Sequence, residues 1–198
     1  MNKPFYFKPH FFTLLLTTCV FLSCSSSDDV EDTPETDPEP GANELSWDGQ
    51  IYKLNDGIFI DYGVSDEGYQ VEIGLTDAML IRVIDGDDQE LQPDENGIEY
   101  LMGFILSSSS AIEFTIGEYT FSNTEELGTS TFTADWLIDR TNNNEFEDPG
   151  DFTLSALNGT MTISGTLPDL IISFDLSMGQ KNLKGNFSHS LQYFDQRD

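Results

Sequence analysis

The sequence predicts an all-β protein, and three observations lead to this prediction. Apolar and polar residues alternate along most of the chain after Leu45, which is the pattern of strands with one buried face. Turn-forming residues interrupt the alternation at short intervals, as they do between antiparallel strands. No window of helical periodicity reaches three turns. We therefore expect about ten or eleven short strands in a single antiparallel β-sandwich, with a closed lipocalin-like β-barrel as the alternative.

The first strands follow from turn signals and from single apolar faces. Asp48-Gly49 predicts a tight hairpin, because both central positions of such a turn accept positive φ. Another strand is expected at Ile58–Tyr62, after a second Asp-Gly pair. The next three predicted core faces are Tyr69, Val71, Ile73 and Leu75; then Met79, Ile81 and Val83; then Ile98, Tyr100, Met102, Phe104 and Leu106.

The second half of the domain continues the alternation with one change of phase. Ile112, Phe114 and Ile116 share one parity, and Tyr119 and Phe121 fall on the other. A bulge or bend at Gly117 would bring both sets into one core. The remaining predicted core faces are Phe132, Ala134, Trp136 and Ile138; Met161 and Ile163; Leu170, Ile172, Phe174 and Leu176; and Leu183, Phe187, His189, Leu191 and Tyr193.

The N-terminus predicts a lipoprotein signal peptide at residues 1–23. Lys3 and Lys8 form a positive region, and the apolar run Phe11–Leu22 is shorter than the roughly 20 residues that span a bilayer. This run ends in a small residue followed by Cys24, the pattern at which bacterial lipoprotein precursors are cut and acylated. We expect Cys24 to be lipidated and Cys19 to leave with the leader. An ordinary secretory signal is the alternative.

Residues 24–43 predict an acidic, proline-containing tether in front of a single domain at residues 44–198. The tether has almost no apolar side chain to bury, and its like charges repel, so we expect it to be disordered and extended. All 36 acidic residues of the chain follow Cys24, and only six basic residues do, which gives the mature chain a net charge of −30. This field repels phosphate backbones and therefore excludes nucleic acid as a partner.

Several strand and turn blocks resemble a known group of proteins. These blocks are residues 47–52 (WDGQIY), 116–121 (IGEYTF), 159–163 (GTMTI), 172–176 (ISFDL) and 183–187 (LKGNF). They look like the recurring blocks of small outer-membrane lipoproteins of the Bacteroidota type. The serine-aspartate start of the tether is also similar to the signal that sends such lipoproteins to the cell surface. The resemblance implies an outer-membrane location, lipid-anchored and surface-exposed, with the periplasmic face as the alternative; it implies no activity and no site residues.

One loop has the composition of a calcium site. From residue 139 onward, oxygen-bearing side chains occupy alternate positions, as in loops that wrap a calcium ion. The match is partial, because position 6 is asparagine rather than glycine and position 12 lacks the bidentate glutamate. A solvated hairpin loop is the alternative. The residues of this possible Ca²⁺ site are Asp139, Thr141, Asn143, Glu145 and Glu147.

Other chemistry has little support in the sequence. The mature chain holds His189 as its one histidine and no free thiol, whereas zinc needs three or four such ligands. We expect His189 to lie in the core or at its margin. There is no Gly-x-Ser-x-Gly elbow, and a glycoside hydrolase pair cannot be chosen among so many carboxylates. We therefore expect no enzymatic activity.

Aromatic residues are the material of sugar-binding platforms, but they also fill cores. Trp136 and Tyr69 share parity with aliphatic residues, which indicates that they point inward. The first functional hypothesis is a non-enzymatic, membrane-anchored surface lipoprotein that acts as a binding or accessory module for another outer-membrane protein. The second is a glycan or small-ligand binding module in nutrient capture, and a hydrolase ranks last. The six aromatic residues in question are Trp47, Tyr52, Tyr62, Tyr69, Trp136 and Tyr193.

Overall fold

The computed structural model describes residues 37–65, 68–85, 88–94, 97–124, 128–141, 143, 146 and 148–197. The predicted signal peptide, Cys24 and the tether up to residue 36 lie outside the described residues. The described part of the chain forms fourteen strands and no helix, so the predicted all-β class is confirmed. None of its elements is a long apolar helix of the kind that crosses a bilayer.

The strands are short and follow one another closely along the chain. They are β1 (Glu44–Trp47), β2 (Gln50–Lys53), β3 (Asp56–Ser65), β4 (Gly68–Thr76), β5 (Leu80–Asp85), β6 (Asp88–Pro93), β7 (Tyr100–Ser108), β8 (Gly117–Phe121), β9 (Thr131–Ile138), β10 (Phe152–Ser155), β11 (Asn158–Thr166), β12 (Asp169–Met178), β13 (Lys181–Phe187) and β14 (Gln192–Asp195).

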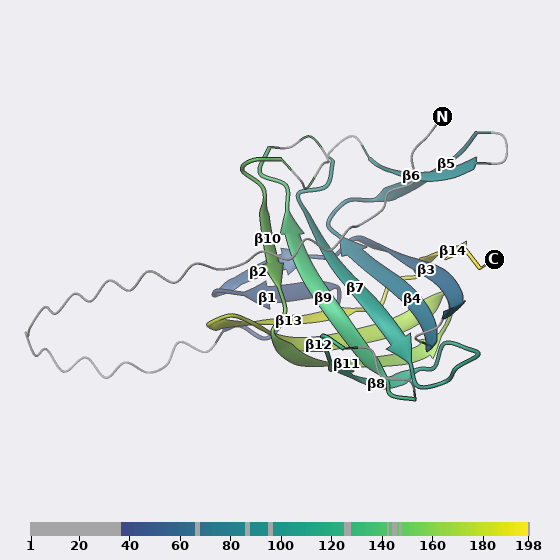
Figure 1. The fold of residues 1–198 in the computed structure, drawn as a ribbon. Coiled ribbons are helices and arrows are strands. Elements are labelled where there is room, and N and C mark those ends of the chain that lie inside the picture. Colours follow the sequence, from purple (N-terminus) through teal and green to yellow (C-terminus); the bar gives the residue numbers. More distant parts are fainter. Residues whose placement is uncertain are drawn as a thin grey trace, which may run out of the picture. The chain divides into compact units, whose positions relative to one another are not determined.

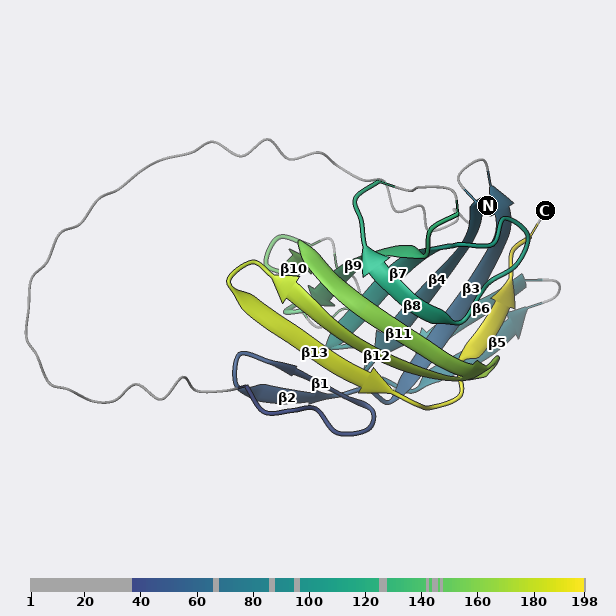
Figure 2. The ribbon, with the colours of Figure 1, turned by 90° about the horizontal axis from the view of Figure 1, so that it is seen from below.

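Twelve of these strands form one sheet. Its order is β14-β3-β4-β7-β9-β8-β11-β12-β13-β1-β2, and β10 pairs with β9 off this path. The sheet curls, so that β3, β4 and β7 lie on one side of the core and β11, β12 and β13 lie on the other (Figures 1 and 2). Strands β5 and β6 form a separate two-stranded ribbon.

The sheet is mixed, which corrects the expectation of a wholly antiparallel one. Strand β14 runs parallel to β3, and β8 runs parallel to β9 over two residue pairs. Both exceptions arise where the chain leaves the hairpin order. After β13 the chain crosses to the β3 edge, and after β7 the loop 109–116 carries it past β9. The alternation of apolar and polar residues predicts a strand and its buried face, but it does not predict whether that strand runs parallel or antiparallel to its neighbour.

The predicted core is largely confirmed. The inward faces of β4, β7, β9, β11 and β12 are buried at every position that the alternation marked within these strands, except for the partly buried Ile138 at the end of β9. Trp136 has no exposed surface and contacts the rings of Trp47 and Tyr52 edge-on, at centroid distances of 4.9 Å and 5.2 Å. Rings packed in this way contribute about 0.5–1.5 kcal/mol beyond the area that they bury.

Two glycine turns are where the sequence placed them. Asp48 and Gly49 have φ values of 53° and 74°, and they join β1 to β2 in the predicted tight hairpin. Gly117 has a φ of 141° and begins β8. Phe114 before it and Tyr119 after it both reach the core, so the expectation for this bend is confirmed for these residues but not for Ile112 and Ile116.

Three predicted core faces are wrong in part. Met79 and Ile81 are about half exposed, because their strand belongs to the separate ribbon and this face has no layer to cover it. Ile112 and Ile116 are exposed on a loop, not buried on a strand. The last predicted strand is in fact two strands, β13 and β14, which lie toward opposite ends of the strand order. His189 is exposed in the segment that connects them.

Candidate functional site

In the predicted calcium loop, two aspartate side chains accept hydrogen bonds from other groups of the same loop. The Asp139 side chain is buried and accepts hydrogen bonds from the Thr141 hydroxyl (3.2 Å) and the Asn143 backbone N–H (2.9 Å). Asp151 accepts from the backbone N–H groups of Arg140 (3.0 Å) and Asp148 (3.1 Å). These contacts are typical of loops in which aspartate replaces a missing backbone partner.

The structure brings together three of the five predicted calcium ligands. Glu145 and Glu147 lie outside the described residues. Among those that are described, no three His, Cys, Asp or Glu side chains come close enough to share a metal ion. Calcium binding at Asp139, Thr141 and Asn143 therefore stays a prediction. Its carboxylate ligand would have to exchange hydrogen bonds within the loop for the ion.

Most of the six aromatic residues named above pack inward and against other rings. Trp136 and Tyr69 are buried, and Tyr52 contacts both Trp136 and Tyr100 edge-on. Tyr193 stacks on Phe59 at a centroid distance of 5.8 Å. Five of the six rings therefore fill the core or its margin, whereas Tyr62 is 42% exposed and its hydroxyl donates to Glu72 (2.8 Å).

His189 lies at the margin of the core. Its ring contacts Phe187 edge-on at a centroid distance of 5.7 Å, and its Nδ1 is 3.1 Å from the Asn55 carbonyl oxygen. The side chain is otherwise exposed. This position fits the expected role as a hydrogen-bonded residue at the rim.

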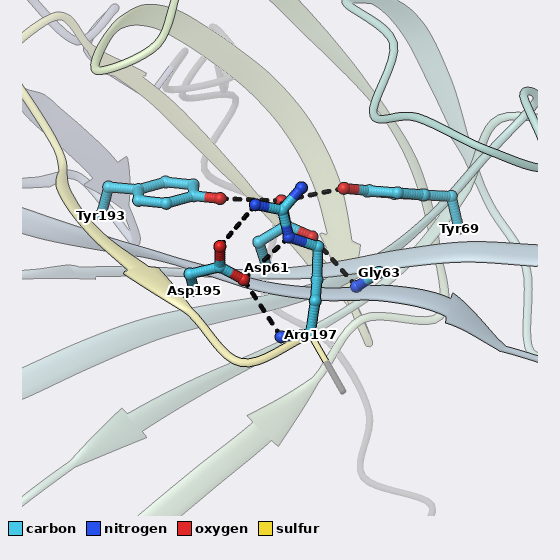
Figure 3. A network of polar contacts seen from close by, with 6 residues as sticks. All are labelled: Asp61, Gly63, Tyr69, Tyr193, Asp195 and Arg197. Atoms are coloured by element: carbon cyan, nitrogen blue, oxygen red, sulfur yellow. Dashed lines mark hydrogen bonds and ion pairs between the residues drawn. The ribbon is translucent and has the colours of Figure 1, made fainter.

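A polar network that the sequence did not reveal surrounds Asp61 of β3 (Figure 3). The buried Asp61 carboxylate accepts hydrogen bonds from the Tyr69 hydroxyl (2.8 Å), the Tyr193 hydroxyl (3.0 Å) and the Gly63 backbone N–H (3.0 Å). Arg197 Nε lies 3.8 Å from the same carboxylate. The network therefore joins β3, β4 and β14.

Electrostatics in this network favour a structural role. Burial, together with the Asp61 carboxylate, raises the pKa of Tyr193 to about 12 and also raises that of Tyr69. Hydrogen bonds from Arg197 lower the pKa of Asp195 to about 2. Both phenols thus stay protonated and act as hydrogen-bond donors to Asp61. The arrangement fastens the C-terminal strand β14 to the edge of the sheet.

The end of the acidic segment is ordered, which corrects the expectation of disorder up to residue 43. The Gly49 backbone N–H donates to Asp37 (2.8 Å), Lys184 donates to Glu39 (2.8 Å), and Asn43 accepts from the Ser188 backbone N–H (2.7 Å). We call residues 37–43 the strap. Composition predicted disorder here because the strap has little to bury, but its polar groups have partners about 145 positions away in sequence on β13 and just after it.

An open apolar hollow of about 450 Å³ lies where the loop 113–116 faces the turn 165–167. Its floor includes the core residues Phe114 and Leu170, and its rim includes Ile116 and Leu167. Ile112, on the same loop, is 77% exposed, and Ile116 is 54% exposed. Exposed aliphatic side chains around an apolar hollow are the surface property that protein interfaces use.

The loop that carries Ile112 and Ile116 is held in place by contacts with residues of the neighbouring strands. The Phe114 ring contacts Phe59 edge-on at 5.1 Å. The Ser108 hydroxyl accepts from the Thr115 backbone N–H (3.1 Å), and the Tyr119 hydroxyl donates to the Thr115 carbonyl (2.5 Å). A fixed loop loses less conformational entropy on binding than a free one, so this surface is preorganised.

Comparison of the chain with protein-family models, with curated proteins and with solved structures gave no match.

Proposed function

We propose that the chain is a non-enzymatic, lipid-anchored surface lipoprotein of the outer membrane, and that its β domain is a binding or accessory module for another outer-membrane protein. The observation that carries the binding role is the exposed pair Ile112 and Ile116 beside the apolar hollow. The signal Phe21–Cys24 supports the anchor, and the resemblance of the strand blocks supports the location.

A protein partner fits this surface better than a sugar does. Burying an aliphatic side chain stabilises a complex by about 25 cal/mol per Å² of apolar surface, and sugars offer little such surface. Five of the six aromatic rings that could stack on a sugar lie instead in the core or at its margin, and Tyr62 is the exposed one. The partner must also tolerate the net charge of −30 of the mature chain, so its contact surface should be neutral or basic.

The anchor is tested by following acylation of the full-length chain. Metabolic labelling with a palmitate analogue should label the wild type and the Cys19→Ala variant, because Cys19 leaves with the leader. Cys24→Ala should carry no label and should be released from the membrane. A labelled Cys24→Ala variant would refute the anchor without bearing on the binding surface.

The binding surface is tested in cells that express the tagged, full-length chain at its natural level. Chemical crosslinking and gentle solubilisation should recover one stoichiometric outer-membrane protein with the wild type. Ile116→Ser should reduce its recovery at least fivefold, because a desolvated aliphatic contact is lost. The matched control is Leu157→Ser, which removes an aliphatic side chain of similar exposure (63% against 54%) that does not line the hollow. Equal recovery with both variants would refute this surface.

A further inference from the structure

The outer face of β11, β12 and β13 carries a regular set of polar side chains. These three strands are neighbours and lie side by side in Figure 2. Their register aligns side chains in rows across the strands. We call the resulting nine residues the polar grid. Its three rows are Thr162, Ser173 and Asn186; Thr160, Asp175 and Lys184; and Asn158, Ser177 and Asn182.

The polar grid is nearly uncharged in a strongly acidic chain. It contains one carboxylate, Asp175, and one ammonium, Lys184, which lie 3.9 Å apart; the Lys184 ammonium also pairs with Glu39 of the strap at 2.8 Å. The other seven residues are hydroxyls and amides. The chain as a whole has 36 acidic residues against eight basic ones. A face that only needed solubility could carry the same excess of acids, so its neutrality suits an uncharged ligand.

Two hollows adjoin on this face. One has a volume of about 260 Å³ and is lined by the first two rows. The other has about 290 Å³ and is lined by the third row together with Thr160 and Asp175 of the second. They share Thr160 and Asp175. The strap supplies one wall of the first hollow through Glu39 and Pro40, and Lys184 and Asn186 hold that wall in place.

We infer that the polar grid binds a neutral oligosaccharide, with neighbouring sugar units in the two hollows. Hydroxyl and amide side chains both donate and accept hydrogen bonds, as sugar hydroxyls do, so each unit can replace its water partners without leaving polar groups unpaired. The Asp175 carboxylate and the Lys184 ammonium strengthen such bonds at the shared boundary. Because the ligand carries no charge, added salt should leave its affinity unchanged.

This site is independent of the proposed protein-binding surface. The apolar hollow shares no lining residue with either hollow of the polar grid. A failure of one proposal therefore leaves the other standing. Together they describe a module that holds a glycan on one face and a protein at one end.

The test is an NMR titration of the mature chain with a panel of neutral hexasaccharides built from α-1,4-glucose, β-1,4-glucose, β-1,4-xylose and β-1,4-mannose. At least one should shift the backbone amide signals of β11–β13 and leave those of β4 and β7 unchanged. Its Kd should be the same in 0.05 M and 0.5 M NaCl. An acidic hexasaccharide of galacturonic acid serves as the charged comparison and should not bind.

Two variants locate the site. Thr162→Val keeps the shape of an exposed strand residue and removes the hydroxyl, so it should weaken binding at least fivefold; Ser173→Ala should do the same. The matched control, Thr153→Val on β10, should bind as the wild type does. The inference is overturned if no neutral hexasaccharide shifts any signal, if the shifts fall on other strands, if only the acidic probe binds, or if Thr162→Val binds unchanged.

Discussion

Gly185→Ala is expected to destabilise the domain, because this glycine leaves room for a core ring. Gly185 is a buried residue of β13 and faces Phe174 of β12 in the register. A Cβ added at Gly185 would lie 2.6 Å and 2.7 Å from the two Cε atoms of the Phe174 ring, and closer still to its Cζ. The ring cannot swing freely, because it is buried and packs against Phe104 at a centroid distance of 5.1 Å.

The expected loss in the free energy of unfolding is the cost of overpacking minus the stabilisation that alanine gives relative to glycine in a strand. Inserting a methyl group into a filled core costs about 1–3 kcal/mol. Replacing glycine with alanine in a strand returns about 0.5–1 kcal/mol through the unfolded chain. The two ranges leave a net loss between about 0 and 2.5 kcal/mol, and contacts as short as these favour the upper part, about 1–2 kcal/mol. For a domain of this size, each kcal/mol lowers Tm by about 2–4 °C, which gives a decrease of about 2–8 °C.

The matched control is Gly103→Ala on β7, where a Cβ would meet nothing closer than the Asp135 carbonyl oxygen at 3.9 Å. This variant should be as stable as the wild type or slightly more stable. Urea unfolding followed by tryptophan fluorescence gives both free energies, and calorimetry gives both Tm values. Phe174→Leu should recover part of the loss in the Gly185→Ala background, since the two changes share one space. If Gly185→Ala matches Gly103→Ala, the packing argument is wrong.

Three further predictions concern the polar contacts. Tyr193→Phe should lower the free energy of unfolding by about 1–2 kcal/mol, because it removes a hydrogen bond to a buried carboxylate; hydrogen exchange should show β14 opening first, and an unchanged exchange rate would contradict this. The pKa of Asp195 is depressed to about 2, so the stability that its contact with Arg197 gives should be complete above about pH 4 and lost as the pH falls towards 2. Arg197→Gln should remove this pH-dependent part of the stability, as measured by Tm at a series of pH values. If Tm of the variant and of the wild type changed in parallel with pH, the prediction would be wrong. If the 139–147 loop binds calcium, a chelator should lower Tm of the wild type, and replacing Asp139 and Asn143 with alanine should abolish the difference; identical melts with and without chelator would exclude the ion.

The alternation of apolar and polar residues predicted the buried side chains correctly where other strands cover the apolar face of a strand. Tyr69, Val71, Ile73 and Leu75 are buried because β4 lies over the core, with β11–β13 across from it. The same pattern failed at Ile81, since a run of alternating residues does not say whether another layer will cover its apolar face. The sequence therefore predicted strands and parities well, and it could not predict which strands would share a sheet.

The functional residues were harder to predict, because they depend on contacts between distant positions. Asp61 is one of 36 acidic residues, and nothing in its sequence neighbourhood marks it as the centre of a network with Tyr193 and Arg197. The polar grid is also invisible in one strand, because each strand shows only the ordinary alternation. It emerges when the register places Thr162, Ser173 and Asn186 in one row.

The strap determines where an anchored chain would enter the domain. Asp37 binds Gly49 in the β1–β2 turn, and Lys181, at the start of β13, pairs with Asp48 of that turn. The end of β12 lies beside Lys181, whereas its beginning follows the turn that borders the apolar hollow.

Strand β12 therefore separates the entry point from the hollow by ten residues, or roughly 33 Å at about 3.3 Å per residue. The hollow therefore lies toward the opposite end of β12 from the point where the strap begins. A partner that binds at the hollow would not need to displace the Asp37 contact with the β1–β2 turn.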